Sequence, residues 1–154
     1  MVQWKLRNQG NCPFCLADNE TTTHILQCKH SDALIGWTEC LHIYLQNLQK
    51  IDTCCAVILA LQNELQAYRY DRPPENLNYP PFLSLVIEEQ QQIGWKSFLE
   101  GLISSKWEQY MNKYYKKKCS NKTGPAWAVK LIQYSLRFVF QLWEIRNKQL
   151  HETA

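Results

Sequence analysis

The chain has 154 residues, 45% of them hydrophobic and 12% aromatic, so it can fold as one domain with its own core, and wholesale disorder is excluded. It shows no apolar run long enough to cross a membrane and no apolar signal segment, so we expect an intracellular protein, cytoplasmic or nuclear, without a membrane partner. The net charge of +3 is uneven: residues 1–92 hold 6 basic and 10 acidic side chains, and residues 93–154 hold 11 and 4. This asymmetry suggests a polyanion-binding face in the second part.

The first element is a segment rich in cysteine and histidine, which we assign to residues 10–30. Cys12 and Cys15 stand three apart, and His24 and Cys28 stand four apart, a spacing that places the second pair on one face of a short helix. Three cysteines and one histidine in this order match a closed tetrahedral zinc site, which leaves no coordination position for a substrate. We therefore predict a zinc knuckle that binds a structural Zn²⁺ ion through Cys12, Cys15, His24 and Cys28.

Two alternatives accompany this assignment. The first is that His30 replaces Cys28 as the fourth ligand, although His24 and His30 lie on different faces of a regular helix. The second is a set of free thiols and a surface histidine with no metal. Glu20 is a candidate acceptor for the second N–H of the histidine ligand, and the threonines at 21–23 are candidate helix caps. The other four cysteines lie among apolar residues and are expected in the core: Cys40, Cys54, Cys55 and Cys119.

Apolar residues spaced three or four apart predict helices over most of residues 31–152. The first helix follows the cap candidates Ser31-Asp32, and the second follows Asp52-Thr53 and ends near residue 70. Paired prolines then predict a linker at residues 71–81.

A third helix is expected to begin at Pro81 and to break or bend at Gly94. A fourth is expected from Trp95 to the lysines at 116–118, and a fifth from Ala126 towards Gln149. The fifth is apolar on nearly every side over residues 131–145, so we expect it to be the buried central helix. No segment alternates with the period of a strand, and the predicted fold is an all-α bundle of about five helices with an N-terminal Cys3His zinc knuckle. Five tryptophans are expected in the core: Trp37, Trp95, Trp107, Trp127 and Trp143.

Cations and aromatic rings alternate at the end of the fourth predicted helix. Lysines contact phosphates and rings stack on unpaired bases, so this mixture suits single-stranded nucleic acid. Tyr110 and Tyr114 fit the apolar face of the helix, whereas Tyr115 lies off it and is the candidate for base stacking. The equally weighted alternative is that the lysines only solvate a helix end. The candidate nucleic-acid-binding residues are Lys113, Tyr115, Lys116, Lys117, Lys118 and Lys122.

The last predicted helix carries further cations. Arg137, Arg146 and Lys148 extend the positive charge along it. Alternatively, Arg146 and Asn147 close a structural hydrogen-bond network with His151 at the helix end.

Two stretches of the sequence resemble a known family. Cys-Pro-x-Cys followed by Glu20-Thr21-x-x-His24-Ile25-Leu26-x-Cys28 resembles the zinc-binding domain at the C-terminal end of non-LTR retrotransposon reverse transcriptases. The pattern Ile93-Gly94-Trp95, Gly101, Trp107, Gly124-x-x-Trp127 and Leu142-Trp143-x-x-Arg146-Asn147-x-x-x-His151 is similar to the helical region that follows the zinc motif in such reading frames.

The resemblance implies an accessory part of an RNA-directed DNA polymerase. The aspartates of a Tyr-x-Asp-Asp polymerase motif are missing from this sequence, so we expect no catalysis here and interpret the chain as a detached C-terminal fragment of such an element. The expected function is zinc-dependent binding of RNA or target DNA. The alternatives are a zinc-stabilised module that docks on the upstream polymerase or endonuclease of the same element, and a remnant without function.

Overall fold

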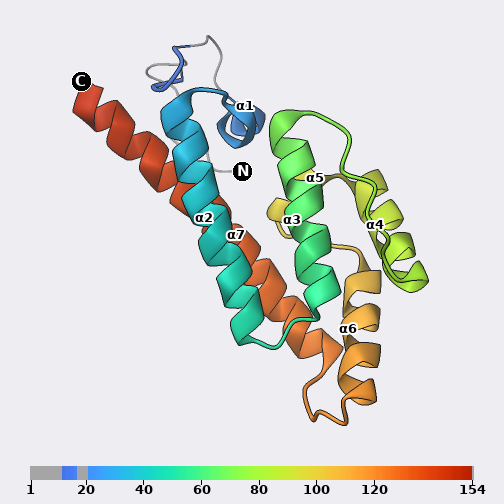
Figure 1. Ribbon diagram of the computed structural model, residues 1–154. Helices are drawn as coiled ribbons and strands as arrows, with labels where there is room; N and C mark the ends of the chain where they lie inside the picture. Colours follow the sequence, from blue (N-terminus) through green and yellow to red (C-terminus); the bar gives the residue numbers. More distant parts are fainter. Residues whose placement is uncertain (1–11, 17–20, 154) are drawn as a thin grey trace.

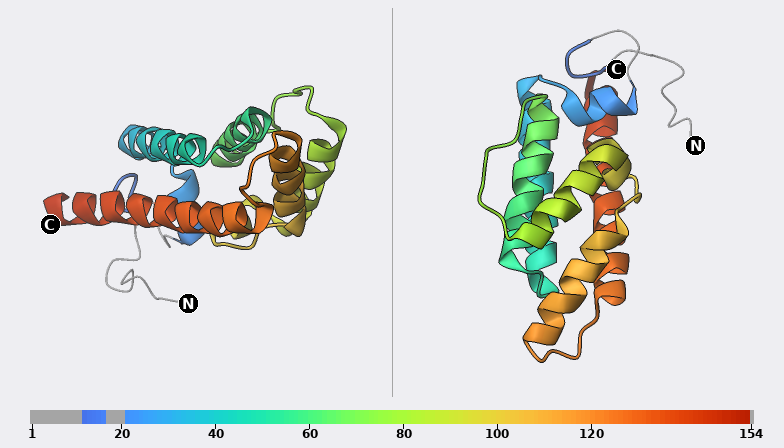
Figure 2. Two further views of the ribbon diagram at one scale, coloured as in Figure 1. Left: turned by 90° about the horizontal axis from the view of Figure 1, so that it is seen from below. Right: turned by 90° about the vertical axis from the view of Figure 1, so that its right-hand side faces the viewer.

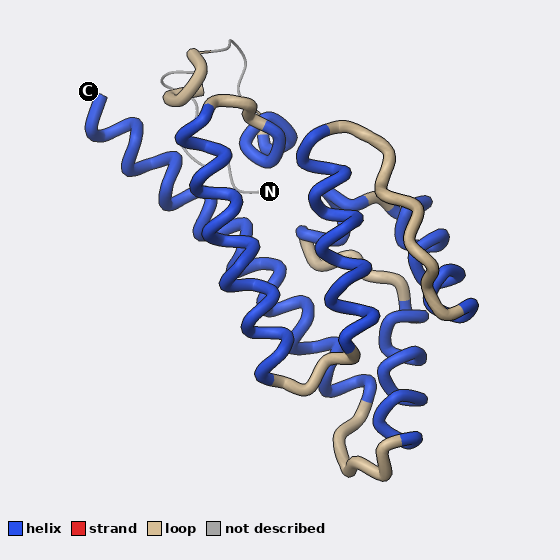
Figure 3. Tube along the Cα trace, viewed as in Figure 1, coloured by secondary structure: helices blue, strands red, loops and turns tan. Residues whose placement is uncertain are grey.

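The computed structural model describes residues 12–16 and 21–153, with side chains up to His151 (Figure 1). Within these residues it contains only helices and loops, which confirms the all-α prediction (Figure 3). None of the described helices is both long enough and apolar enough to cross a membrane. The structure has seven helices in its described parts: α1 (Thr22–Gln27), α2 (Ser31–Lys50), α3 (Cys55–Tyr70), α4 (Pro81–Ile93), α5 (Trp95–Leu99), α6 (Ser105–Lys117) and α7 (Gly124–Thr153).

The longest helix, α7, runs the length of the molecule, and α2 lies antiparallel beside it (Figures 1 and 2). Two hydrogen bonds join α7 to α2 and to the loop that follows α2. Tyr44 and Ser135 join their hydroxyls at 3.0 Å, and the indole of Trp127 donates to Thr53 at 2.8 Å. Helix α6 packs against the first part of α7, α4 packs on α6, and α3 lies beside α2.

The loop between α3 and α4 spans residues 71–80, one residue fewer than the predicted linker at 71–81. Helix α3 ends at Tyr70, where Asp71 adopts a left-handed conformation with φ 52°, and residues 71–80 form a loop. Pro81 then occupies the first turn of α4, as expected for a residue that has no N–H to leave unpaired. Gly94, at φ 109°, ends α4 and begins α5.

The expectation of one helix from Trp95 to residue 118 is wrong, because the chain breaks between α5 and α6. Gly101 adopts φ 100°, a conformation that side chains disfavour, and the Ser104 hydroxyl caps α6 by accepting the Lys106 N–H at 3.0 Å. The buried Gln90 amide secures the break: its oxygen accepts the Ser104 N–H at 2.8 Å and the Trp107 indole N–H at 3.0 Å. The apolar pattern continues across this break because α5 and α6 pack on the same core.

All five of the predicted core tryptophans are buried. The expectation for α7 is only partly met, because its outer side is uncovered: Val129, Leu136 and Phe140 are about half exposed, at 55%, 49% and 53%. Helices α2, α5 and α6 cover the other side of α7, so this helix lies at the edge of the bundle and not at its centre.

The expectation for the four cysteines outside the knuckle is also only half correct. Cys40 and Cys54 are buried, whereas Cys55 and Cys119 are exposed. Cys55 is the first residue of α3, and Cys119 lies in the loop after α6 with φ 56°. Apolar neighbours in the sequence therefore did not decide the burial of these thiols.

Candidate metal centre and basic groove

The predicted ligands come from a tight turn and from a short helix. The turn closes with a hydrogen bond of 2.8 Å from the Leu16 N–H to the Cys12 carbonyl. Thr21 caps α1, as expected, because its hydroxyl accepts the His24 N–H at 3.2 Å. This cap fixes the start of the helical turn that separates His24 from Cys28.

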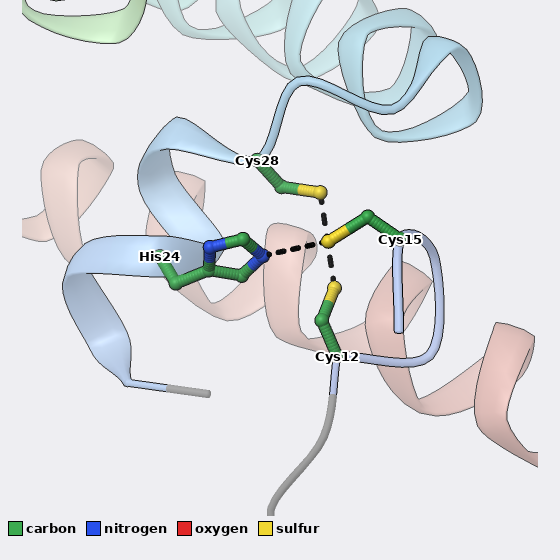
Figure 4. Close-up of side chains that lie close together, drawn as sticks. All are labelled: Cys12, Cys15, His24 and Cys28. Atoms are coloured by element: carbon green, nitrogen blue, oxygen red, sulfur yellow. Dashed lines mark hydrogen bonds between the residues drawn. The ribbon is translucent and has the colours of Figure 1, made fainter. Parts of the chain in front are cut away.

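The four predicted ligands converge on one point (Figure 4). Their donor atoms all lie within 4.8 Å of one another, with the Cys15 sulfur 3.2 Å from His24 Nε2 and the Cys12 sulfur 3.7 Å from that of Cys28. Cys12 and Cys28 are buried, whereas Cys15 is exposed. Three sulfurs and one imidazole nitrogen at these separations can hold a metal ion such as zinc.

His30, the alternative fourth ligand, lies outside this cluster. Its Nδ1 accepts the Asp32 N–H at 3.1 Å, so His30 is the N-cap of α2, a role that the sequence had suggested for Ser31-Asp32. Glu20, the expected partner of the histidine ligand, lies outside the described residues, as do the first two residues of the predicted knuckle.

The surroundings of the cluster match the needs of a thiolate-bound ion. Burial raises the pKa of the Cys12 thiol to about 12, and it also raises the pKa of Cys28, because a dry thiolate is costly without a cation. A bound zinc ion would supply that cation and hold the thiols deprotonated. Four protein donors close its coordination, so the donor set fits a structural ion.

Arg69 joins the cluster to the bundle, and sequence reasoning missed it. This α3 side chain is 1% exposed, and its guanidinium donates to the carbonyls of Leu26, at 2.6 Å, and of the ligand Cys28. Its guanidinium also stacks over the Trp37 ring at 5.2 Å. It thereby satisfies carbonyls at the C-terminal end of α1, where a positive charge is favoured. In the sequence Arg69 resembles an ordinary cation in the last turn of a helix, so no signal marked it.

The expected stacking residue Tyr115 is not available to bases. It is 1% exposed, and its hydroxyl donates to the Ile51 carbonyl at 3.1 Å. The buried stripe of α6 runs through Trp107, Met111 and Tyr115, so the prediction that Tyr115 lies off the core face is wrong. Helical spacing alone allowed a core stripe through Tyr110 and Tyr114 or one through Met111 and Tyr115. Packing of α6 against α7 and the end of α2 selected the second.

The predicted lysines divide into two groups. Lys118 and Lys122 approach Asp52, with Nζ to carboxylate distances of 2.9 and 3.9 Å. The hydrogen bond to Asp52 is also the main cause of a raised pKa at Lys118. Among the described residues, no acidic side chain pairs with the other three predicted lysines, which are all exposed: Lys113, Lys116 and Lys117.

These three lysines line a groove between the start of α4 and α6, which we call the α4–α6 groove. Its volume is about 660 Å³, and Pro80, Phe82, Tyr110 and Tyr114 form the rest of its wall. The rings of Phe82 and Tyr110 stack with centroids 6.0 Å apart and planes at 14°, and the Lys113 ammonium lies 4.3 Å from the Phe82 centroid. The groove therefore joins aromatic rings to cations that have no acidic partner.

The cations of α7 do not form one continuous positive surface. Arg146 is 1% exposed and donates to the Asn147 side chain at 3.0 Å, as the structural alternative expected, whereas His151 is exposed. Arg137 is exposed and stacks over the Tyr134 ring at 5.7 Å.

Comparisons with known proteins return no relative: no family model, no curated protein and no solved structure matches this chain.

Proposed function

We propose that this chain is a non-catalytic, zinc-stabilised nucleic-acid-binding module, an accessory part of a retroelement reverse transcriptase that contacts RNA or target DNA. The observation that carries the proposal is the α4–α6 groove, where three exposed lysines without acidic partners border aromatic side chains. Phosphates require cations, and unpaired bases stack on aromatic faces, so a groove of this composition suits a single strand.

In this proposal the zinc ion acts through the fold. Its ligands hold the turn at residues 12–16 and α1 together, and the Arg69 guanidinium ties the carbonyls at the end of α1 to α3. The ion supplies binding energy that stabilises the folded knuckle. The α4–α6 groove lies on other elements, so its lysines and rings make the contacts with nucleic acid.

The electrostatic part of the proposal is tested by fluorescence anisotropy with labelled single-stranded RNA and DNA over a series of salt concentrations. We expect affinity to fall steeply with salt, and the double variant Lys116→Gln/Lys117→Gln to reduce the slope by roughly 1.4, because about 0.7 is lost per phosphate contact on a single strand. The matched control Lys50→Gln/Lys130→Gln removes the same charge from exposed sites on α2 and α7. A flat salt response of the unaltered chain contradicts the proposal.

The aromatic part is tested with Phe82→Leu, which keeps an apolar side chain at a half-buried position and removes the ring. We expect about a tenfold loss of affinity for single strands, since stacking contributes ~1–3 kcal/mol per base. Affinity for a duplex of the same sequence should change little, because paired bases do not reach the ring. Equal losses for the two forms would exclude stacking in the groove.

A second candidate function is docking on another protein of the same element, and the uncovered side of α7 favours it. Val129, Leu136 and Phe140 lie on one side of this helix at spacings of seven and four. Exposed apolar side chains in such a row are typical of contact surfaces. Unchanged nucleic-acid affinity in the Lys116→Gln/Lys117→Gln variant, with loss of polymerase binding in Phe140→Ser, would favour docking.

A further inference from the structure

Glu64 is a buried acid that neither the metal centre nor the α4–α6 groove uses. It lies in the middle of α3, is 5% exposed, and shares its helix with the core residues Leu61 and Leu65. Within the described residues no hydrogen bond or ion pair reaches its carboxyl group, and burial alone raises its pKa. The Glu64 oxygens are nevertheless not sealed from solvent, so the carboxyl group faces an opening, and packing alone does not explain why an acid stands here.

A second polar group without a partner lies one helical turn further along α3. The hydroxyl of Tyr68 is buried and has no hydrogen-bond partner in the described parts of the chain. Burial, with a smaller contribution from the charge of Glu100, raises the pKa of Tyr68 to about 12, so the phenol keeps its proton. Residues four apart on a helix share a face, so Glu64 and Tyr68 belong to the same side of α3. The Tyr68 hydroxyl itself is sealed from solvent, and the charge of Glu64 acts on Tyr79 and not on Tyr68.

Both residues line one recess of about 400 Å³ between α3, the start of the 71–80 loop and the α4–α5 junction. Trp95 and Gln91 stand on its α4–α5 side, and Asp71 and Arg72 stand at the loop. The one cation of the lining, Arg72, stacks over the Tyr70 ring at 5.0 Å and makes no ion pair with Glu64. The recess therefore combines an acid that has no cationic partner with an aromatic side chain.

We propose that this recess is a binding site for a guanidinium group, with Glu64 as the acceptor and Trp95 as an aromatic wall. A guanidinium is planar, donates two parallel hydrogen bonds to a carboxylate, and stacks on aromatic rings. It also supplies the positive charge that the buried acid lacks. The group belongs either to an arginine side chain of a partner protein or to a small guanidinium compound.

Ligand binding is tested on the full zinc-loaded chain by NMR, with the tryptophan indole N–H signals as the readout. The probes are Nα-acetyl-arginine amide, its neutral isostere Nα-acetyl-citrulline amide, and a blocked Gly-Arg-Gly peptide. We expect the arginine probe to bind with a dissociation constant on the order of millimolar, and the citrulline probe at least about tenfold more weakly. Tighter binding of the peptide identifies a partner protein as the source, and equal binding identifies the guanidinium itself.

Glu64→Gln separates a binding site from a structural acid, because it keeps the shape and removes the charge. We expect this variant to lose arginine binding by at least about tenfold and to raise the thermal midpoint by roughly 2–4 °C, since a buried acid without a partner destabilises the free protein. Glu88→Gln, on the exposed side of α4, is the matched control. It should change neither arginine binding nor the thermal midpoint.

Equal binding of the arginine and citrulline probes, no binding of either, or a lower thermal midpoint in Glu64→Gln would each overturn the proposal. Arg72→Gln tests whether Arg72 is the natural occupant from within the chain. We expect this variant to keep arginine binding, and a loss of stability with no gain in affinity would assign Arg72 as the internal partner of Glu64 and end the proposal. None of these outcomes depends on the α4–α6 groove, so the proposed function is tested separately.

Discussion

The metal centre and the α4–α6 groove are built in different ways. The centre takes its four donors from residues 12–28, where a turn and one short helix set their separation. The groove takes its wall from Phe82 on α4 and from Tyr110 and Tyr114 on α6, two helices that meet only in the folded chain. Ligand spacing within one local unit can be derived from a sequence, whereas the exposure of a ring on a helix depends on which neighbour covers it.

The largest expected effect is loss of the metal, which tests whether the donors in residues 12–28 form the site. Cys15→Ser and His24→Ala should each lose stoichiometric zinc in elemental analysis, because each removes one of four donors. Cys119→Ser and His42→Ala, at exposed positions outside the cluster, are the matched controls. Retention of one zinc ion per chain in both variants would contradict the assignment of Cys15 and His24 as zinc ligands. Chelation should also speed hydrogen exchange first in residues 21–28.

The next effect concerns the contact of α6 with α7, which holds the α6 wall of the groove in place. In Gly124→Ala the added Cβ would meet the Glu108 carbonyl oxygen at 2.2 Å and the Asn112 Cβ at 2.8 Å, so α6 and α7 must move apart. We expect a loss of about 2–3 kcal/mol in the free energy of unfolding, measured by urea denaturation, while zinc binding persists. Ala126→Gly, at an exposed position two residues further on, is the control for backbone effects. Unchanged stability would show that the α6–α7 contact is not tight.

A smaller effect is expected where the centre depends on tertiary structure. Arg69→Met removes the donor to the Leu26 and Cys28 carbonyls and should weaken zinc binding by about 10–100-fold, the range found when the supporting contacts of metal ligands are lost. A chromophoric chelator in competition measures the affinity, and circular dichroism verifies that the helices persist. Arg72→Met, three residues along and exposed, is the control. Equal zinc affinity in the two variants would show that zinc binding does not depend on the contact between Arg69 and the knuckle.

The smallest effect concerns the two lysines that Asp52 holds. Asp52→Asn releases Lys118 and Lys122 and should tighten binding of single-stranded nucleic acid by roughly two- to fivefold at low salt, with a steeper salt dependence. Asparagine suits the left-handed backbone at this position, where φ is 59°. Asp71→Asn removes the same charge at another left-handed position, with φ 52°, and serves as the control. Equal gains in both variants would indicate a general charge effect.

Burial was harder to predict than helix content. Tyr110, Tyr114 and Tyr115 all lie on α6, and helical spacing alone placed the first two in the core and the third outside. In the folded chain Tyr115 is buried, and the other two tyrosines line the groove. A helix with aromatic side chains on several sides has more than one possible core stripe, and only its packing partners choose between them.

The sequence by itself determined the features that depend on neighbours along the chain. These are the ligand cluster, the helical character, the end of α3 before the paired prolines, and the start of α4 at Pro81. Tertiary structure decided the break between α5 and α6, the pairing of Asp52 with two lysines, the contact of Arg69 with the knuckle, and the isolation of Glu64. Backbone geometry and side-chain spacing act over a few residues, whereas charge pairing and burial are set by groups that come together only when the bundle closes.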